Sequence, residues 1–355
     1  MLDWYIIKKF LVSYIFMVLV LIVVMCMIDF VEKYDDFVEK KAPVDKIIFD
    51  YFVNFIAFIA NIMNPICVFI SVIFFTARMT NQSEVVAVLC NGISFYRMLA
   101  PFMATAVFLA VISFYMNAYV VPHAVYARLD FEAVYVKSHR PYEARNIHKK
   151  ISPQTSAYVY SYNQYHKEGL KFSLEKFDTE GHLVEKIASQ KVKWLGENSW
   201  RLEKVLVKQI KTDGEVISHR KTLDTTLLLS PDDIYQRENL AESLTYTELL
   251  DYIDLETDRG STYLKELVLE KHERIVYPFA TIILTLIGVA FSTQKRRGGI
   301  AFQITLGLIL CFIYILIQSI AKVTIGEKYS EWVALWLPNF IFLGLAVFFI
   351  RMAPK

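Results

Sequence analysis

Residues 10–28 read FLVSYIFMVLVLIVVMCMI, a stretch with thirteen Leu, Ile, Val or Phe side chains among nineteen and no charge. A helix needs ~20 mainly apolar residues to cross a ~30 Å hydrocarbon layer. Because each of these side chains favours insertion by roughly 0.3–0.6 kcal/mol, the whole stretch favours the bilayer by several kcal/mol. No small-residue cleavage site follows Ile28, so we expect a membrane-spanning helix rather than a cleaved signal peptide.

Five further apolar runs follow in a chain of 355 residues that is 55% hydrophobic and has a positive mean hydropathy. Six such runs disfavour a soluble protein with buried core helices. They form two groups of three, separated by about 150 residues of polar, strand-patterned chain. We therefore predict an α + β membrane protein with six transmembrane helices (3+3) and a β-jelly-roll domain inserted between helices three and four. The runs cover residues 51–77, 99–121, 275–291, 300–321 and 332–350, and the expected domains are 1–121, 122–271 and 272–355.

The basic residues beside the spans predict the orientation of the chain, because cytoplasmic loops carry an excess of Lys and Arg. With the N-terminus inside, the inner segments hold only Asp3 and Glu84 as acids, whereas the outer loops mix lysines with many acids. The unopposed cluster Lys295-Arg296-Arg297 decides the orientation. We expect both termini in the cytoplasm and the middle domain on the opposite side. The other inner basic residues are Lys8, Lys9, Arg78, Arg97, Arg351 and Lys355.

The polar middle segment has the pattern of an antiparallel β domain. Runs of strand-forming residues, such as SAYVYSY at 156–162, alternate with turns rich in Gly, Asn and Asp. Val205 and Val207 alternate with Lys204 and Lys208, as in a strand with one buried face. Short strands at regular spacing indicate a sandwich or jelly roll. Further strands are predicted at 170–177, 183–194, 199–210 and 215–229, followed by helices at 245–256 and 262–272.

The chain carries no recognisable catalytic or energy-coupling motif. No Gly-Lys pair occurs, so there is no phosphate-binding loop, and no second histidine follows His272-Glu273 at zinc-protease spacing. The four cysteines lie in or beside the spans, so neither a disulfide framework nor a zinc site is expected. The spans hold no ionised residue, which disfavours a proton-driven transporter. We expect no enzyme activity, cofactor, metal or nucleic-acid ligand, and an energy source on another chain.

Residues 81–92, NQSEVVAVLCNG, lie on the inner side between spans two and three and predict a short helix. Ser83 or Asn81 is expected to cap its start, Glu84 to favour the positive end of its dipole, and Gly92 to supply a left-handed stop. Two interpretations stay open: an interfacial helix lying on lipid headgroups, or a coupling helix seated in a groove of a cytoplasmic ATPase. Its apolar stripe consists of Val85, Val88 and Leu89.

A family resemblance rests on four segments taken together. Residues 75–101, FTARMTNQSEVVAVLCNGISFYRMLAP, resemble the segment between spans two and three of the LptF/LptG permeases, the membrane subunits of the lipopolysaccharide-exporting ABC transporter. The other segments are Tyr5-Ile-Ile-Lys-Lys-Phe10, Arg274-x3-Pro278 with Lys295-Arg-Arg-Gly-Gly299, and Trp336-Leu-Pro-Asn339. The middle domain matches by position and strand character only. The order of these segments, rather than any single motif, carries the resemblance.

The resemblance implies a mechanism and a set of partners. In the family, two homologous permease chains enclose a cavity that opens toward the outer leaflet, and a cytoplasmic LptB-type ATPase dimer drives its closure. Lipopolysaccharide is squeezed out of the membrane and passes along jelly-roll domains. An LptC-type single-span protein gates the cavity, and an LptA-type periplasmic bridge leads to the outer membrane. The resemblance places this chain in the inner membrane of a Gram-negative bacterium, in contact with membrane lipid.

The same resemblance implies functional residues. Glu84, Val85, Val88, Leu89 and Gly92 are expected to dock on the ATPase, with Glu84 paired to a basic residue there. Lys33 is the best candidate for the lipid A phosphates; salt bridges to Glu32, Asp36 and Glu39, or simple snorkelling, are the alternative. The other substrate candidates are Lys40, Lys41, Ile22, Met25, Phe302, Leu306, Ile309 and Ile313.

For the middle domain, an apolar groove and tight core packing are alternative interpretations of the same side chains, which are Tyr158, Tyr160, Tyr162, Phe172, Leu174, Val192 and Trp194. Unpaired strand edges could pair with a neighbouring domain. Two other functions remain possible: a membrane scaffold or sensor without transport activity, and a permease of this architecture for another envelope lipid. The compact length favours the LptG-like over the LptF-like subunit.

Overall fold

The computed structural model describes the chain in two compact units, residues 1–136 with 268–355 and residues 137–267. The basic cluster at 295–297, used above for the orientation, lies outside the described residues. The described residues are 1–136, 144–152, 154–163, 167–178, 180–196, 198–211, 214–227, 240–259, 263–294, 299–325 and 331–353.

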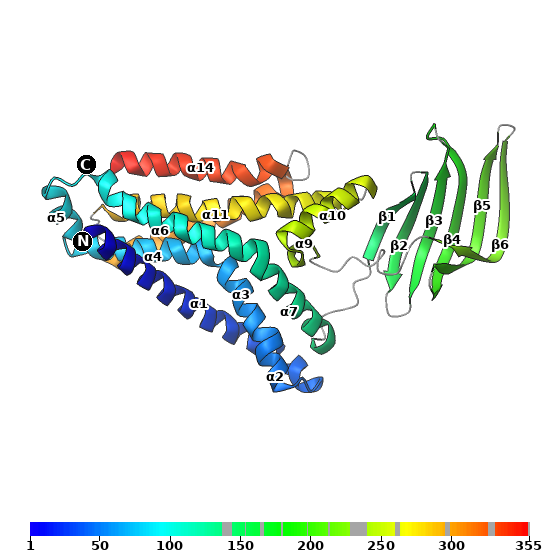
Figure 1. Ribbon diagram of the computed structural model, residues 1–355, viewed down its shortest axis with the longest axis horizontal. Helices are drawn as coiled ribbons and strands as arrows, with labels where there is room; N and C mark the ends of the chain where they lie inside the picture. Colours follow the sequence, from blue (N-terminus) through cyan, green and yellow to red (C-terminus); the bar gives the residue numbers. More distant parts are fainter. Residues whose placement is uncertain are drawn as a thin grey trace. The chain divides into compact units, whose positions relative to one another are not determined.

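The first unit is helical, and its long helices run beside one another (Figure 1). The first half contains α1 (Leu2–Glu39), α2 (Val44–Lys46), η1 (Ile47–Phe52), α3 (Val53–Ile62), α4 (Asn64–Asn81), α5 (Glu84–Cys90), α6 (Phe95–Tyr115), η2 (Met116–Val120) and α7 (Val121–Tyr135). The second half contains α11 (Leu264–Ser292), α12 (Gly299–Ile320), η3 (Ala321–Ile325) and α14 (Glu331–Met352).

The expected six spans agree with these helices. Five helices are long and apolar enough to cross a membrane, and the pair Val44–Ile62 and Asn64–Asn81 forms a sixth span when counted together. The pair is bent by 59°. Pro65 lies in the first turn of α4, where its missing N–H costs no hydrogen bond, so a new helix can begin directly after the bend. Hydropathy does not predict the break in the second span, because the apolar run 51–77 continues on both sides of it.

Hydrogen bonds from three other helices surround the bend. The Tyr14 hydroxyl donates to Asn64 Oδ1 (2.7 Å), and Asn64 Nδ2 donates to Thr281 Oγ1 (3.2 Å). Ser113 Oγ donates to Asn61 Oδ1 at 3.1 Å, and the Tyr277 hydroxyl donates to the Ile62 carbonyl. Unpaired polar groups are costly inside a membrane, so these bonds stabilise the bend against α1, α6 and α11.

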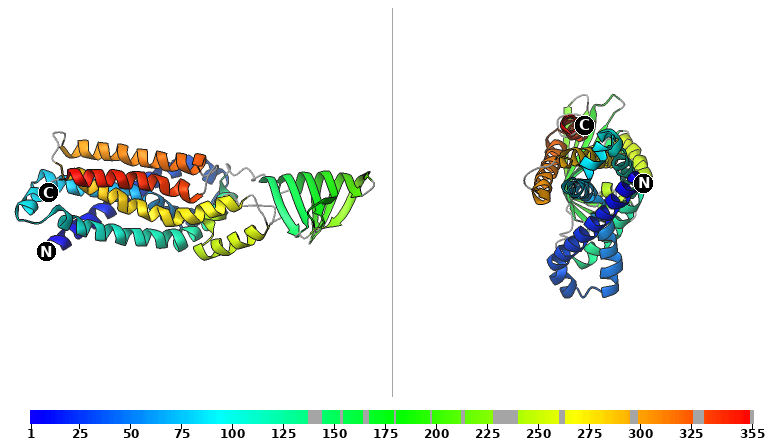
Figure 2. Two further views of the ribbon diagram at one scale, coloured as in Figure 1. Left: turned by 90° about the horizontal axis from the view of Figure 1, so that it is seen from above. Right: turned by 90° about the vertical axis from the view of Figure 1, so that its left-hand side faces the viewer.

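α4 is the central helix of this unit, because it packs against both α1 and α12. Val68, Val72 and Phe75 share a cluster with side chains of α1, α6 and α11, whereas Phe69 and Ile73 share one with side chains of α11, α12 and α14. A Cβ added at Gly307 would lie 2.2 Å from Ile73 Cδ1, so this glycine permits the close approach of α12 to α4. Figure 2 gives the end-on view of this packing.

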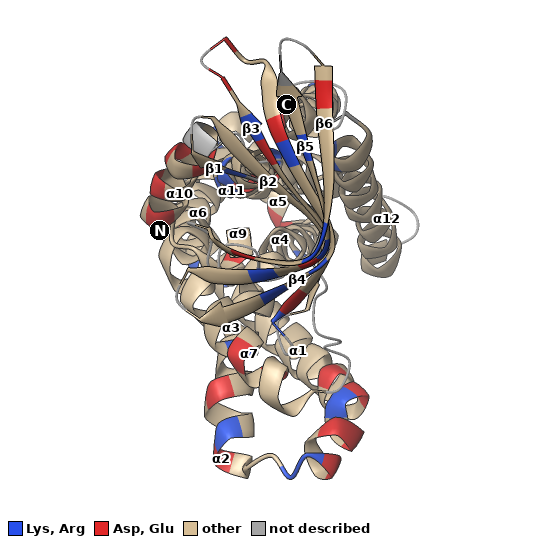
Figure 3. Cartoon of the chain, turned by 90° about the vertical axis from the view of Figure 1, so that its right-hand side faces the viewer, with Lys and Arg blue, Asp and Glu red and all other residues tan. Residues whose placement is uncertain are grey.

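The second unit contains one antiparallel sheet and two short helices. Its strands pair in the order β1-β2-β3-β4-β5-β6, a meander that curves around one face (Figure 3). This confirms the expected antiparallel β domain inserted between the two helical groups. The elements are β1 (Ala144–Ser152), β2 (Thr155–Asn163), β3 (Glu168–Phe177), β4 (Leu183–Gly196), β5 (Ser199–Lys211), β6 (Gly214–Thr226), α9 (Leu240–Ser243) and α10 (Tyr246–Arg259).

One face of the sheet carries a single apolar core, but strict alternation does not describe which residues join it. Val205 and Val207 are buried as expected, and Lys204 is exposed. Leu202 lies in the same core although it is three positions from Val205. Lys204, between them, has a φ of 52°, which lets the strand change which alternate residues point inward. Lys171 on β3 has a φ of 50° and has the same effect between Gly169 and Phe172.

The sequence left open whether seven side chains of the β domain belong to its core or to a groove, and the structure shows which of them are in the core. Tyr162, Phe172, Leu174 and Val192 are buried in it. Trp194 packs against the core from a partly buried position. Two residues stand apart: Tyr158 packs on the ring of His148, and Tyr160 is exposed beneath the ammonium group of Lys171.

Candidate functional site

The short helix α5 begins directly at Glu84. Ser83 has a left-handed backbone (φ 61°) and makes no side-chain cap, so the expected capping by Ser83 was wrong; its φ excludes the extended backbone of a capping serine. Gly92 is left-handed (φ 78°), as expected. The Glu84 carboxylate accepts a hydrogen bond from the Tyr5 hydroxyl (3.2 Å) of α1. This bond holds Glu84 beside the start of α1.

The apolar stripe of α5 faces the chain's own spans. Val85 is buried, and Val88 and Leu89 pack against the same cluster of α1, α4 and α6 side chains. The side chains that α5 leaves exposed are Val86, Ala87 and Cys90. A partner that bound α5 could thus contact these three residues, Glu84 and the partly exposed Val88 and Leu89, but not the buried Val85. The periodicity of the sequence identified the apolar face of α5, but not that this face packs against the spans of the same chain.

An ion pair missed by the sequence analysis lies next to this helix. Arg97 Nη1 and Nη2 donate to the two oxygens of Asp3, at 2.8 and 2.6 Å. This hydrogen bonding lowers the pKa of the exposed Asp3 carboxyl below its usual value. The pair joins the start of α1 to the start of α6, the two helices that flank α5. The sequence shows opposite charges at Asp3 and Arg97, near the ends of two spans. It does not show that they pair, because the two residues are 94 positions apart and meet only in the folded chain.

Lys33 lies in a half-buried polar cluster at the other end of α1. Its Nζ is 3.1 Å from Asp29 Oδ1 and 2.9 Å from Glu132 Oε1, and it also donates to the Tyr51 hydroxyl. The Tyr51 hydroxyl donates to Asp29 Oδ2 at 2.7 Å. Arg128 Nε lies 3.6 Å from the same Glu132 oxygen. The described ion-pair partners of Lys33 are thus Asp29 and Glu132, not the expected Glu32, Asp36 or Glu39. Of these two partners, only Asp29 could have been predicted from the sequence, because it lies four residues before Lys33 on the same helix.

The remaining candidate lysines are exposed near the end of α1. Lys40, the residue after α1, donates from Nζ to the Val134 carbonyl of α7 at 3.2 Å. Lys41 occupies a left-handed turn with a φ of 51°. Both lie beyond the apolar part of the helix.

The apolar candidates lie on two helices that α4 separates. On α1, Ile22 and Met25 are half-buried. On α12, Phe302, Ile309 and Ile313 are 46%, 50% and 44% exposed, and Leu306 is half-buried. Because α1 and α12 both pack against α4, one chain presents these residues as two apolar surfaces.

The motif around Arg274 is part of the fold at the start of the fourth span. Arg274 is buried and its Nε donates to Glu270 Oε1 at 2.9 Å, one turn earlier on α11. Lys322 Nζ donates to Glu273 Oε2 at 2.5 Å, which ties η3 to α11. In both pairs the charge of the carboxylate is compensated by a cation at the approach to the span.

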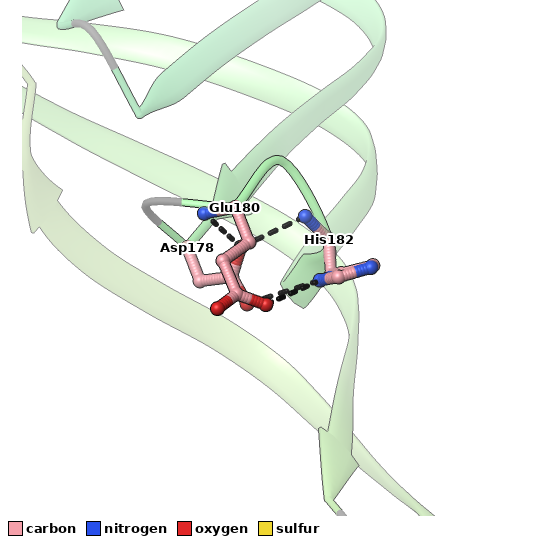
Figure 4. A group of neighbouring side chains, drawn as sticks. All are labelled: Asp178, Glu180 and His182. Carbon is pink, nitrogen blue, oxygen red and sulfur yellow. Dashed lines mark hydrogen bonds and ion pairs between the residues drawn. The ribbon is translucent and has the colours of Figure 1, made fainter.

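Asp178, Glu180 and His182 come together in the turn between β3 and β4 (Figure 4). Asp178 Oδ1 accepts hydrogen bonds from the backbone N–H groups of Glu180 (2.9 Å) and His182 (2.8 Å). These bonds from His182 and Glu180 lower the pKa of the Asp178 carboxyl. The cluster is exposed, and the arrangement is that of a side-chain-stabilised turn.

The comparisons with known proteins agree with this architecture. The family model for the lipopolysaccharide export system permease LptF/LptG matches residues 4–352. The chain belongs to the LptF/LptG family. The match includes both groups of spans, the short helix α5 and the β domain between them. No curated protein matches the chain.

Membership of the LptF/LptG family defines the general role of the protein. The chain is a multi-pass membrane protein and a permease component of the lipopolysaccharide export system. Such a component works together with other proteins of the Lpt complex. In this LptF/LptG chain one side of α5 is exposed, and Lys33 and Arg97 form ion pairs within the chain.

Proposed function

We propose that this chain extracts lipopolysaccharide from the outer leaflet of the inner membrane and passes it toward the outer membrane, driven by a separate cytoplasmic ATPase. The observation that carries the proposal is the family match over residues 4–352, which includes the spans and the β domain. The proposal implies an LptB-type ATPase dimer, a second LptF/LptG-type chain, an LptC-type protein and an LptA-type bridge as partners. Both termini are then cytoplasmic and the β domain is periplasmic.

The coupling surface in this proposal is the exposed side of α5 together with Glu84. The buried Val85 and the partly buried Val88 and Leu89 fasten α5 to the spans, so a force applied to α5 is transmitted to α1, α4 and α6. Glu84 supplies the charge that meets a basic residue of the ATPase. The rigid attachment supports coupling better than a helix that floats on lipid headgroups.

The substrate surface in this proposal is assembled from two chains. The apolar residues of α1 and α12 lie on separate surfaces of one chain, so a second homologous chain supplies the opposing wall for the acyl chains. Lys33, Lys40 and Lys41 lie at the end of α1, near headgroup depth, where their ammonium groups attract lipid A phosphates.

The β domain in this proposal carries the lipid after release. Its curved sheet has one apolar face, and this curvature supports assignment as an open jelly roll. The sheet begins with β1 and ends with β6, and either edge suits strand addition by an LptC-type or LptA-type domain.

Purification of the chain with its co-expressed partners, followed by mass spectrometry of the bound lipid, tests the proposal. We expect lipopolysaccharide and a bound ATPase subunit. A different envelope lipid would support the alternative permease of the same fold, and a complex without an ATPase would contradict the proposed energy source.

Lys33→Glu is expected to lower lipopolysaccharide crosslinking and export by about tenfold or more, because it replaces an attractive charge by a repulsive one at the phosphate position. Crosslinking in cells and release from proteoliposomes measure the effect. Lys46→Glu, an exposed lysine of α2, is the matched control and should behave as the parent chain. Equal activity of the two variants would reject Lys33 as a substrate residue.

A further inference from the structure

Five side chains from three segments form the cluster around Lys33: Asp29 and Lys33 on α1, Tyr51 on η1, and Arg128 and Glu132 on α7. The charged side chains are largely buried, with 18% of Lys33, 13% of Asp29, 12% of Arg128 and 9% of Glu132 exposed. Two cations and two carboxylates balance in formal charge. Burying such charges is unfavourable unless each is paired with an opposite charge.

Glu132 is shared between both cations. Its Oε1 is the ion-pair atom for Lys33 at 2.9 Å and for Arg128 at 3.6 Å. Among the described residues, Arg128 Nε is a buried donor without a hydrogen-bond partner. The Arg128 guanidinium instead packs on the Phe58 ring, 4.4 Å from its centre. One carboxylate therefore serves two cations, and one buried donor has no acceptor.

The same cluster holds α1 to α7. Asp29 lies one turn before Lys33 on the same helix, whereas the Lys33–Glu132 pair crosses from α1 to α7. Phe37 on α1 packs against Phe131 on α7 at 5.8 Å between ring centres, directly beside this pair. Breaking the Lys33–Glu132 pair would remove one polar contact between the two helices, which also meet through this aromatic packing and the Lys40–Val134 bond.

We infer that Glu132 is an internal counter-anion of Lys33 that a lipid phosphate replaces during transport. This inference rests on the proposed function. A phosphate carries more negative charge than a carboxylate and offers three acceptor oxygens, so it can satisfy Lys33 and the open Arg128 donor together. Glu132 is then a positioning residue: it blocks the cations in the empty chain, and its displacement loosens α1 from α7 when the headgroup arrives.

The test compares Glu132→Gln with Asp130→Asn in the assembled complex in nanodiscs. Both variants remove one carboxylate from α7, but Asp130 is exposed whereas Glu132 is buried. The probe is a fluorescent diphosphorylated lipid A, with inorganic phosphate as competitor. Glu132→Gln should bind the probe about tenfold more tightly, because the competing anion is gone, whereas Asp130→Asn should not change.

A second readout separates this role from a purely structural one. Spin labels on α1 and α7 should report a wider distance distribution in Glu132→Gln and, in the parent chain, upon addition of lipid A. The double variant Glu132→Gln/Lys33→Met should lose the gain in binding. Weaker or unchanged probe binding in Glu132→Gln would overturn the inference, as would displacement of the probe by inorganic phosphate at equal concentration, which would indicate a site for the free anion.

The two proposals fail in different ways. If Glu132→Gln tightens probe binding but the purified complex carries another phosphorylated lipid, the counter-anion role stands and lipopolysaccharide export does not. If the complex exports lipopolysaccharide and Glu132→Gln leaves both probe binding and the α1–α7 distance unchanged, the counter-anion role is wrong and the export function stands.

Discussion

Glu84→Lys is expected to reduce ATP-driven lipopolysaccharide release by about 100-fold or more while the chain still folds and inserts. Loss of a charge-assisted bond of ~1.5–3 kcal/mol, with repulsion added by the lysine, accounts for this size. Glu84 is partly exposed at the first residue of α5, and its described hydrogen bond joins it to Tyr5, so the substitution leaves the core intact. Release from proteoliposomes and the ATPase rate of the same preparation measure the effect.

Tyr5→Phe is the matched control for Glu84→Lys. It removes the intramolecular hydrogen bond to Glu84 but keeps the carboxylate, so release should remain within about twofold of the parent, as for the loss of a weak exposed hydrogen bond. If Tyr5→Phe were as inactive as Glu84→Lys, Glu84 would act through the fold of its own chain. Full assembly and full ATP-driven release in Glu84→Lys would exclude the coupling role.

Trp200→Ala is expected to destabilise the β domain by ~3–5 kcal/mol, the usual range for removing a fully buried aromatic side chain. Trp200 is completely buried, lies opposite Trp194 in the sheet and packs on Tyr162 with 6.2 Å between ring centres. Since a domain of this size is stable by only about 5–15 kcal/mol, much of its stability would be lost. Hydrogen exchange of β2–β5 in the intact chain measures the change.

Leu170→Ala provides the comparison on the same sheet. Leu170 is 51% exposed, so its truncation should cost no more than about 0.5 kcal/mol. The helical unit should keep its exchange protection in both variants, because Trp200 belongs to the core of the β domain alone. Equal exchange protection of β2–β5 in Trp200→Ala and in the parent chain would contradict the described core.

Local properties of the sequence determined the membrane helices and the turns. A run such as residues 10–28 inserts because of its length and composition, and α1 is indeed continuous over it. Gly92 ends its segment in a left-handed conformation because no side chain opposes that φ angle. The order of the strands followed from short turns between them, which favour antiparallel neighbours.

Tertiary structure alone decided which surfaces are covered and which charges are paired. The periodicity of α5 identified the stripe at Val85, but the packing of α1, α4 and α6 turned it inward. Lys33 meets Glu132, 99 positions away, because α1 and α7 lie together. The bend at Met63 is likewise held by side chains of other helices. Composition and periodicity reflect the preference of a short segment for a helix, a strand or the membrane. These contacts, in contrast, join segments that are distant in the sequence and meet only after folding.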